Sequence, residues 1–340
     1  MLIQTAFKVL FCHRISKPLM LFLIGLFCWL IASPVKLPST PYFVIVPPHI
    51  SADQLADQLA QDNAIRSRHL MCILTRLFHV DKKIQAGRYS FKKATSLLGM
   101  LQVFSSGQVD PLSITIIEGM NIYQMRNLLN KAPDLQHNTK DFTNRTLLQK
   151  IGIKNSTTNH PEGLFFPSTY FYQPQSSDIT ILQKAYQKMQ QTLKKIWQHR
   201  DSNLPYKNPQ QLLIMASLVE KETANPKDRP KIAAVLINRL KIHMRLQTDP
   251  TVMYGINPYL RHLTYQQLHQ DTAYNTYTRT GLPPTPIALP SEASLVAAAH
   301  PDKEVNALYF VARGDGSSAL SKNLTEHNAA VQKYILKKSK

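Results

Sequence analysis

The stretch from Pro209 to Glu222, PQQLLIMASLVEKE, decides the fold. Asn208 is a good N-cap and Pro209 suits the first helical position, so a helix is predicted to begin there. Its residues from Leu212 to Val219 are apolar on every side, and a helix that is apolar all round is a buried one. It should end before Pro226, because the residue ahead of a proline avoids helical backbone angles. The sequence therefore predicts a central, buried helix in a folded domain.

Two glutamates, Glu220 and Glu222, occupy the last turns of this helix. The negative end of the helix dipole and an apolar surround both favour a protonated carboxyl, which suits a proton donor. The two side chains point about 200° apart around the helix, so they cannot share one cleft. Glu220 stacks over the small residues Ala216 and Ser217, which leave room for a ligand. Geometry therefore favours Glu220 as the acid.

A structural explanation of this pair of glutamates stays open. Both could be exposed at the end of the helix, or one could form an ion pair with Arg239 or Lys221. Perturbed carboxylates also occur in structural networks, so the residue types alone do not decide between the two explanations.

The composition indicates a folded chain with a basic surface. Of its 340 residues, 44% are hydrophobic and 18% are charged, which is typical of a globular protein rather than a disordered one. Forty basic residues against 21 acidic ones give a formal charge of +19. Such a charge favours a polyanionic neighbour, which could be nucleic acid, anionic lipid or an acidic polymer.

An uncharged apolar segment, PLMLFLIGLFCWLIAS, runs from Pro18 to Ser33 near the N-terminus. Its length is at the short end of what spans a membrane, for which about 17–25 residues are typical. The nearby basic residues are Lys8, Arg14 and Lys17 before the segment and only Lys36 after it. By the positive-inside rule we predict a cytoplasmic N-terminus at 1–17 and a single transmembrane helix at 18–34.

A cleaved signal peptide is the alternative to a retained anchor. Ile31 and Ser33 make a poor small-x-small cleavage site and Pro34 would follow the cut, so the retained anchor is favoured. Export of the remaining chain excludes nucleic acid as a partner. Only Cys72 of the three cysteines would then be exported, so no internal disulfide can form, and no spacing suggests a metal site. We expect neither a metal nor a cofactor.

The region after the anchor alternates short strands and helices, which predicts an α+β fold. A strand, a turn and a short helix occur twice, at 44–60 and 114–129. This pattern could be a weak internal repeat or ordinary α+β alternation. The basic amphipathic segment from Ile179 to His199 predicts a further helix with one solvated face.

Residues 237–256 and 273–291 are dense in amides, hydroxyls and aromatic rings. These groups suit a polyhydroxylated chain, which needs stacking faces as well as hydrogen bonds. The same residue types could reflect turn chemistry alone. The predicted substrate-binding residues are Ser217, Asn238, Gln247, Thr248, Asp249, Tyr254, Asn275 and Tyr277. Glu222 and Arg239 are predicted to support them from behind.

Four motifs in order carry a resemblance to a known family: ASLVEKET, INRL with MRLQTDPTVMYG, TAYNTYTRTGLPPTPIALPS, and AAAHP with LYFVARGDG. Together with IQAGRYSF, ITIIEG and EGLFFPSTY upstream, they resemble the endolytic murein transglycosylases of the MltG type, also called YceG-like. The likeness covers nearly the whole region after the predicted anchor.

The resemblance implies a single-pass protein of the cell inner membrane with a cytoplasmic N-terminus and a periplasmic catalytic domain. It implies a linker and LysM-like α+β module at 35–145, and a mixed α+β catalytic domain at 146–340 built around the buried helix. The implied partners are peptidoglycan glycan strands as substrate and peptidoglycan synthases at the inner membrane.

The implied reaction cleaves nascent glycan strands between N-acetylmuramic acid and N-acetylglucosamine. The family's catalytic residue is the first glutamate of the VEKET motif, which is Glu220 here. It protonates the glycosidic oxygen and then, as a carboxylate, takes the proton of the muramyl C6 hydroxyl. That hydroxyl closes a 1,6-anhydro ring, so one carboxylate suffices where ordinary glycosidases use two.

Two departures from the family pattern affect binding rather than catalysis. His49 stands where the first turn of the LysM-like module usually has Gly, and Leu320 stands where an aromatic residue is common. Two other functions stay open: a hydrolase in which Asp249 activates water against Glu220, and a non-catalytic scaffold that binds the wall.

Overall fold

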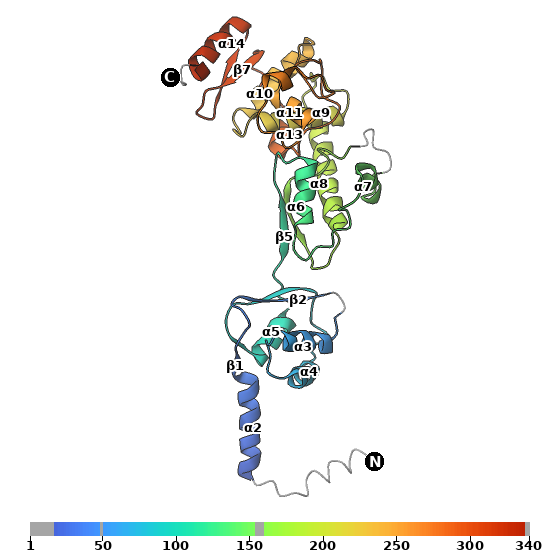
Figure 1. Cartoon of the computed structure of the whole chain (residues 1–340), viewed down its shortest axis with the longest axis vertical. Helices are drawn as coiled ribbons and strands as arrows, with labels where there is room; N and C mark the ends of the chain where they lie inside the picture. The colour runs from blue at the N-terminus through green and yellow to red at the C-terminus, as the bar shows by residue number, and fades with distance from the viewer. Residues whose placement is uncertain (1–16, 48–49, 154–159, 337–340) are drawn as a thin grey trace. The chain divides into compact units, whose positions relative to one another are not determined.

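The computed structural model describes residues 17–47, 50–153 and 160–336, in two compact units (Figure 1). The first unit covers the described residues up to Leu112 together with Gln173–Gln175, and the second covers the rest. The sequence predicts a boundary after residue 145, whereas the division falls at 112. The reason is that residues 113–130 pack within the second unit, where the Ile122 N–H donates to Glu162. His49 lies outside the described residues.

The first unit contains two small antiparallel strand pairs and four helices. Its elements are α2 (Lys17–Ala32), β1 (Pro34–Val35), β2 (Tyr42–Val46), α3 (Ala52–Gln61), α4 (Arg68–Leu77), β3 (Gly87–Phe91), β4 (Thr95–Ser96) and α5 (Leu97–Ser106). β2 pairs with β3, placing Tyr42 opposite Phe91, and β1 pairs with β4. The strand and short helix predicted at 44–60 are confirmed as β2 and α3, and the N-cap of α3 is Ser51, whose hydroxyl accepts the Gln54 N–H.

The anchor predicted at 18–34 corresponds to α2. This helix has 16 residues, or about 24 Å at 1.5 Å per residue, whereas a bilayer's hydrocarbon core is about 30 Å thick. No helix in the described part of the chain is both long enough and apolar enough to cross a membrane.

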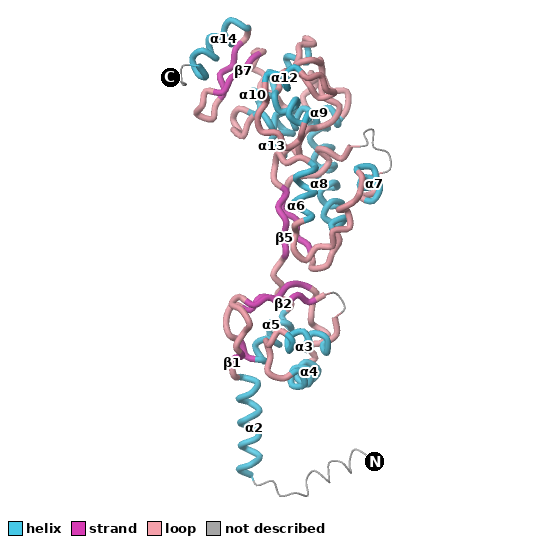
Figure 2. Tube along the Cα trace, in the orientation of Figure 1, coloured by secondary structure: helices cyan, strands magenta, loops and turns pink. Residues whose placement is uncertain are grey.

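The second unit is mainly helical, and its strands form two separate pairs (Figure 2). Its elements are β5 (Leu112–Ile116), α6 (Ile122–Asn130), α7 (Asn144–Lys150), β6 (Ser168–Tyr172), α8 (Asp178–His199), α9 (Pro209–Glu222), α10 (Arg229–Lys241), α11 (Asp249–Ile256), α12 (Tyr265–His269), α13 (Glu292–Ala299), β7 (Tyr309–Ala312), β8 (Ser318–Ser321), α14 (Leu324–Val331) and a π-helical turn (Gln332–Leu336). β5 pairs with β6, and β7 pairs antiparallel with β8.

Helix α9 is the centre of the second unit, as the sequence predicts. The Asn208 side chain accepts the Gln211 N–H at 3.0 Å and Pro209 is the first helical residue. Every residue from Leu212 to Val219 is buried. Helices α8, α10 and α13 all pack against α9, while β7 and α14 pack together beside α10. The last turn of α9 is thus carried on a helix that the surrounding core holds in place.

The first unit depends on an aromatic cluster, and we predict that Phe104→Ala destabilises it by about 3–5 kcal/mol. Phe104 is fully buried, with its ring centroid 4.9 Å from that of Tyr89 and 5.7 Å from that of Phe91. Chemical denaturation of the purified chain measures the loss. Phe43→Ala is the matched control, because Phe43 is 46% exposed. Equal losses in the two variants would contradict this description of the core.

Candidate active site at the end of α9

Glu220 is held on both carboxylate oxygens. Its side chain is only 6% exposed, and Oε1 lies 3.3 Å from Nη2 of Arg229, whose side chain is 11% exposed. Oε2 accepts the Ser291 N–H at 2.9 Å and the Ser291 hydroxyl at 2.5 Å. Hydrogen bonds and a nearby cation stabilise the charged form of a carboxylate. Glu220 therefore pairs with Arg229, and not with the Arg239 or Lys221 that the sequence suggests.

The space predicted beneath Glu220 is filled by protein. Ser217 is fully buried, its hydroxyl donates to the Ile214 carbonyl at 2.7 Å, and it accepts the Ile287 N–H at 3.1 Å. The segment before α13 thus covers the small residues of α9. The expectation that Ala216 and Ser217 leave room for a ligand is wrong, and Ser217 makes its hydrogen bonds within the protein.

Glu222 lies in a different environment. It is half-buried, and its carboxylate has no hydrogen-bond partner among the described residues. Burial, followed by the neighbouring Asp249 carboxylate, raises the pKa of Glu222 to about 7, against the opposing effect of Arg239. Asp249, the first residue of α11, in turn accepts the Tyr277 hydroxyl at 2.5 Å. The structure thus brings three of the predicted site residues, Asp249, Tyr277 and Arg239, around Glu222 rather than around Glu220.

Arg239 is fixed behind this group. It is 6% exposed, its Nε donates to the Leu308 carbonyl at 2.6 Å and its Nη1 donates to the Leu246 carbonyl at 2.6 Å. The Tyr309 ring of β7 lies 5.3 Å from the guanidinium carbon. Burial lowers the pKa of Arg239, while the Tyr309, Tyr277 and Glu222 side chains raise it. It supplies a fixed positive charge near Glu222, as the predicted supporting role requires.

Three other predicted substrate-binding residues build the loops around the site. Asn275 is fully buried and donates to the Leu268 and Gln270 carbonyls. Thr248 is also buried, and its N–H donates to the Thr276 hydroxyl at 3.0 Å. Gln247 has an exposed side chain on a left-handed backbone, with φ of 51°. Of these three side chains, only that of Gln247 reaches solvent.

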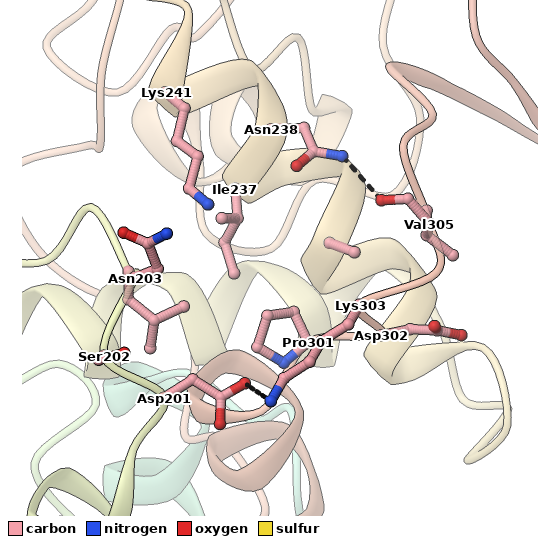
Figure 3. Close-up of a pocket in the computed structure, with 12 residues that line it drawn as sticks. Asp201, Ser202, Asn203, Ile237, Asn238, Lys241, Pro301, Asp302, Lys303 and Val305 are labelled. Atoms are coloured by element: carbon pink, nitrogen blue, oxygen red, sulfur yellow. Dashed lines mark hydrogen bonds and ion pairs between the residues drawn. The ribbon is translucent and has the colours of Figure 1, made fainter.

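Asn238 faces a separate pocket of about 380 Å³ (Figure 3). Its amide donates to the Val305 carbonyl at 3.0 Å, and the Asp201 carboxylate lies 3.3 Å from Lys303 Nζ on another wall. Neither Glu220 nor Glu222 lines this pocket. The structure therefore does not bring Asn238 to either carboxylate.

Tyr254 contacts Glu162, a residue that the sequence did not point to. Its hydroxyl donates to Glu162 at 2.9 Å, and Glu162 is fully buried and also accepts the Ile122 N–H at the start of α6. Burial raises the pKa of Glu162 to about 7, although these donors oppose the shift. A lone carboxylate within the apolar stretch EGLFFPSTY was the available signal. Within the described residues, no three His, Cys, Asp or Glu side chains are placed to share a metal ion.

Comparison with known proteins identifies the family. The model of the YceG-like family matches residues 44–333, most of both units. The chain belongs to the YceG-like family. It is 32% identical over 311 residues to the endolytic murein transglycosylase of Bacillus subtilis, covering 86% of this chain and 85% of that protein. An endolytic murein transglycosylase of Streptococcus pneumoniae is 28% identical over 74% of this chain, which spans only 51% of that relative.

A solved structure supports the fold assignment. A 2.6 Å crystal structure of a yceG-like protein from Listeria monocytogenes superposes with a TM-score of 0.55 at 26% identity. The match covers 85% of this chain and 98% of that chain. This structural match confirms the predicted mixed α+β fold. Homology to endolytic murein transglycosylases extends over most of the chain.

The two glutamates should differ in their effect on stability. Glu220→Gln leaves the buried Arg229 charge without its partner, and we predict a loss of about 3 kcal/mol. For Glu222 the folded-state pKa, about 7, lies above the ordinary value of 4.5, so its stabilising contribution is present below pH 4.5 and is lost as pH rises through 7. Glu222→Gln should therefore cost nothing at pH 8.

Thermal and urea unfolding of both variants at pH 8 measures this contrast. The two substitutions make the same chemical change two residues apart in one helix, so each is the control for the other. If Glu222→Gln lowers the free energy of unfolding more than Glu220→Gln does, the environments of the two glutamates are assigned the wrong way round.

Proposed function

We propose that this protein is an endolytic murein transglycosylase that cleaves peptidoglycan glycan strands between N-acetylmuramic acid and N-acetylglucosamine. The observation that carries the proposal is the unpartnered Glu222 carboxyl, whose pKa is raised to about 7 beside Asp249. A general acid near neutral pH needs such a group. The Bacillus subtilis relative, 32% identical, is an endolytic murein transglycosylase, which supports the same reaction class.

We also propose Glu222, rather than the Glu220 predicted from the sequence, as the proton donor. Glu220 is fully engaged by Arg229 and Ser291, so a substrate oxygen would have to displace a buried ion pair to reach it. Glu222 is half-buried and has no hydrogen-bond partner in the described part of the chain. In this assignment Glu220 is a positioning residue that fixes the end of α9.

The mechanism then needs one carboxyl in two roles. Glu222 donates its proton to the glycosidic oxygen, the bond from that oxygen to the muramyl C1 breaks, and positive charge develops at C1. The Glu222 carboxylate next takes the proton of the muramyl C6 hydroxyl, whose oxygen bonds to C1 and closes the anhydro ring. Arg239 stabilises the carboxylate between the two steps, because it is a fixed positive charge in a protected environment.

Hydrolysis is a second candidate function, because two carboxyls lie together at the site. Asp249 is close enough to raise the pKa of Glu222 and is oriented by the Tyr277 hydroxyl. A pair of this kind can activate water on the second carboxylate, as in ordinary glycosidases. The two reactions differ in their products, since hydrolysis leaves reducing ends.

The cellular setting stays a prediction from the sequence. An inner-membrane location, a cytoplasmic N-terminus, a periplasmic catalytic domain, a LysM-like module and peptidoglycan synthases as partners are all proposed on the N-terminal pattern and the family motifs. They fit a peptidoglycan substrate, which lies outside the cytoplasm.

Digestion of purified peptidoglycan sacculi tests the proposed reaction. We expect anhydromuramyl ends from the wild type and at least a 100-fold loss of rate in Glu222→Gln, the range for a removed general acid. Mass spectrometry of the released fragments counts the two kinds of end. Reducing ends would support the hydrolase, and sacculi left uncut by the wild type would support a non-catalytic scaffold. If Glu220→Gln folds normally but loses its cleavage rate while Glu222→Gln stays active, Glu220 would again be assigned as the proton donor.

The pH dependence of the rate provides a further test. Because Glu222 must be protonated to start the reaction and its pKa is about 7, kcat/KM should be level below pH 6 and fall about tenfold per pH unit above 8. Initial rates on sacculi between pH 5 and 9 measure the profile. A rate that keeps rising through pH 8 would contradict an acid of this pKa.

A further inference from the structure

A second pocket, of about 420 Å³, is lined in part by the last turn of α9. Its lining includes Asp249, whose charge acts on Glu222, and Lys221, the residue between the two glutamates. Tyr259 and Arg261, from the segment after α11, also line this pocket. The pocket therefore shares Asp249 with the surroundings of Glu222.

The charges in this pocket are unbalanced. Neither Lys221 nor Arg261 forms an ion pair with an acidic side chain among the described residues. Lys221 Nζ donates to the Gly119 carbonyl at 3.3 Å and keeps two further N–H groups. Asp249, the acidic residue of the lining, already accepts the Tyr277 hydroxyl. Two cations are thus free to meet an anionic group on a ligand.

The walls of the pocket are fixed before any ligand arrives. The Asn121 side chain, which caps α6, donates to the Pro258 carbonyl at 2.7 Å and ties the two sides together. The Tyr254 side chain is held by the hydrogen bond from its hydroxyl to Glu162. Tyr259 is 56% exposed and offers a flat face, with the Tyr123 ring 6.5 Å away. An aromatic face and two cations in one pocket suit a sugar ring that carries a carboxylate.

We propose that this pocket recognises the carboxylate-bearing lactyl arm of the muramyl residue, with Lys221 and Arg261 binding the carboxylate and Tyr259 contacting the sugar. The inference rests on the proposed function, and it identifies which sugar of the strand occupies the position beside Glu222. N-acetylglucosamine has no acidic arm, so the two cations distinguish the two alternating sugars. The carboxylate can belong to the stem peptide or to a bare lactyl group, since both present the same anion.

Binding of three disaccharides to the purified full chain tests the proposal. Each probe is N-acetylglucosaminyl-N-acetylmuramic acid: one carries a tetrapeptide, one a bare lactyl carboxylate, and one a neutral lactyl amide. None contains the bond that the enzyme would cut, so binding is read independently of catalysis. Calorimetry should show at least one carboxylated probe binding about tenfold more tightly than the amide, the scale of one charge-assisted hydrogen bond. Arg261→Gln should remove most of this difference.

Lys194→Gln is the matched control, because Lys194 lies on the exposed face of α8 and does not line the pocket. It should keep the preference for the carboxylated probes, and Lys221→Gln should reduce it. A tighter tetrapeptide probe would assign the carboxylate to the stem, and equal binding of both acids would assign it to the lactyl group. Equal binding of all three probes, no binding, or an unchanged preference in Arg261→Gln would overturn the proposal. Carboxylate preference without anhydromuramyl products would instead refute only the proposed reaction.

Discussion

The ion pair between Glu220 and Arg229 is the interaction on which the site depends. Glu220 is in the last turn of α9, Arg229 begins α10, and Ser291, which donates to the same carboxylate, is the N-cap of α13. One buried carboxylate therefore joins the ends of three helices. A buried charge left without its partner is strongly destabilising, so this junction strongly favours one arrangement. The direction of the next two residues, Lys221 and Glu222, follows from it.

The junction separates two chemically identical side chains into different roles. Glu220 accepts hydrogen bonds from three donor groups, of Arg229 and Ser291, whereas Glu222 has Asp249 and Arg239 as its charged neighbours. Rigid support of the first glutamate is what allows the second to stay free, because it needs no hydrogen bond of its own to hold its position.

The sequence was sufficient for α9, and for the separation of its two glutamates, because both follow from local rules. The Asn208 cap, the apolar run and the 100° step per residue all concern neighbours within one helix. Which face stays open depends on contacts with residues about 70 positions away, from Ile287 and Ser291, and no local periodicity encodes these. Small side chains at Ala216 and Ser217 indicate a close approach, but a backbone segment can make that approach as well as a ligand.

Glu162 is a second buried carboxyl near the site, hydrogen-bonded to Tyr254. Its carboxyl is fully buried, and burial outweighs the Ile122, Tyr254 and Gly163 donors, so its pKa rises to about 7, the same range as that of Glu222. Both groups therefore contribute stability that is present below pH 4.5 and is lost as pH rises through about 7. Unfolding experiments sense both carboxyls, whereas in the proposed reaction the proton transferred to the glycosidic oxygen comes from Glu222 alone. The pH dependence of stability and that of rate should coincide in range while arising from different residues.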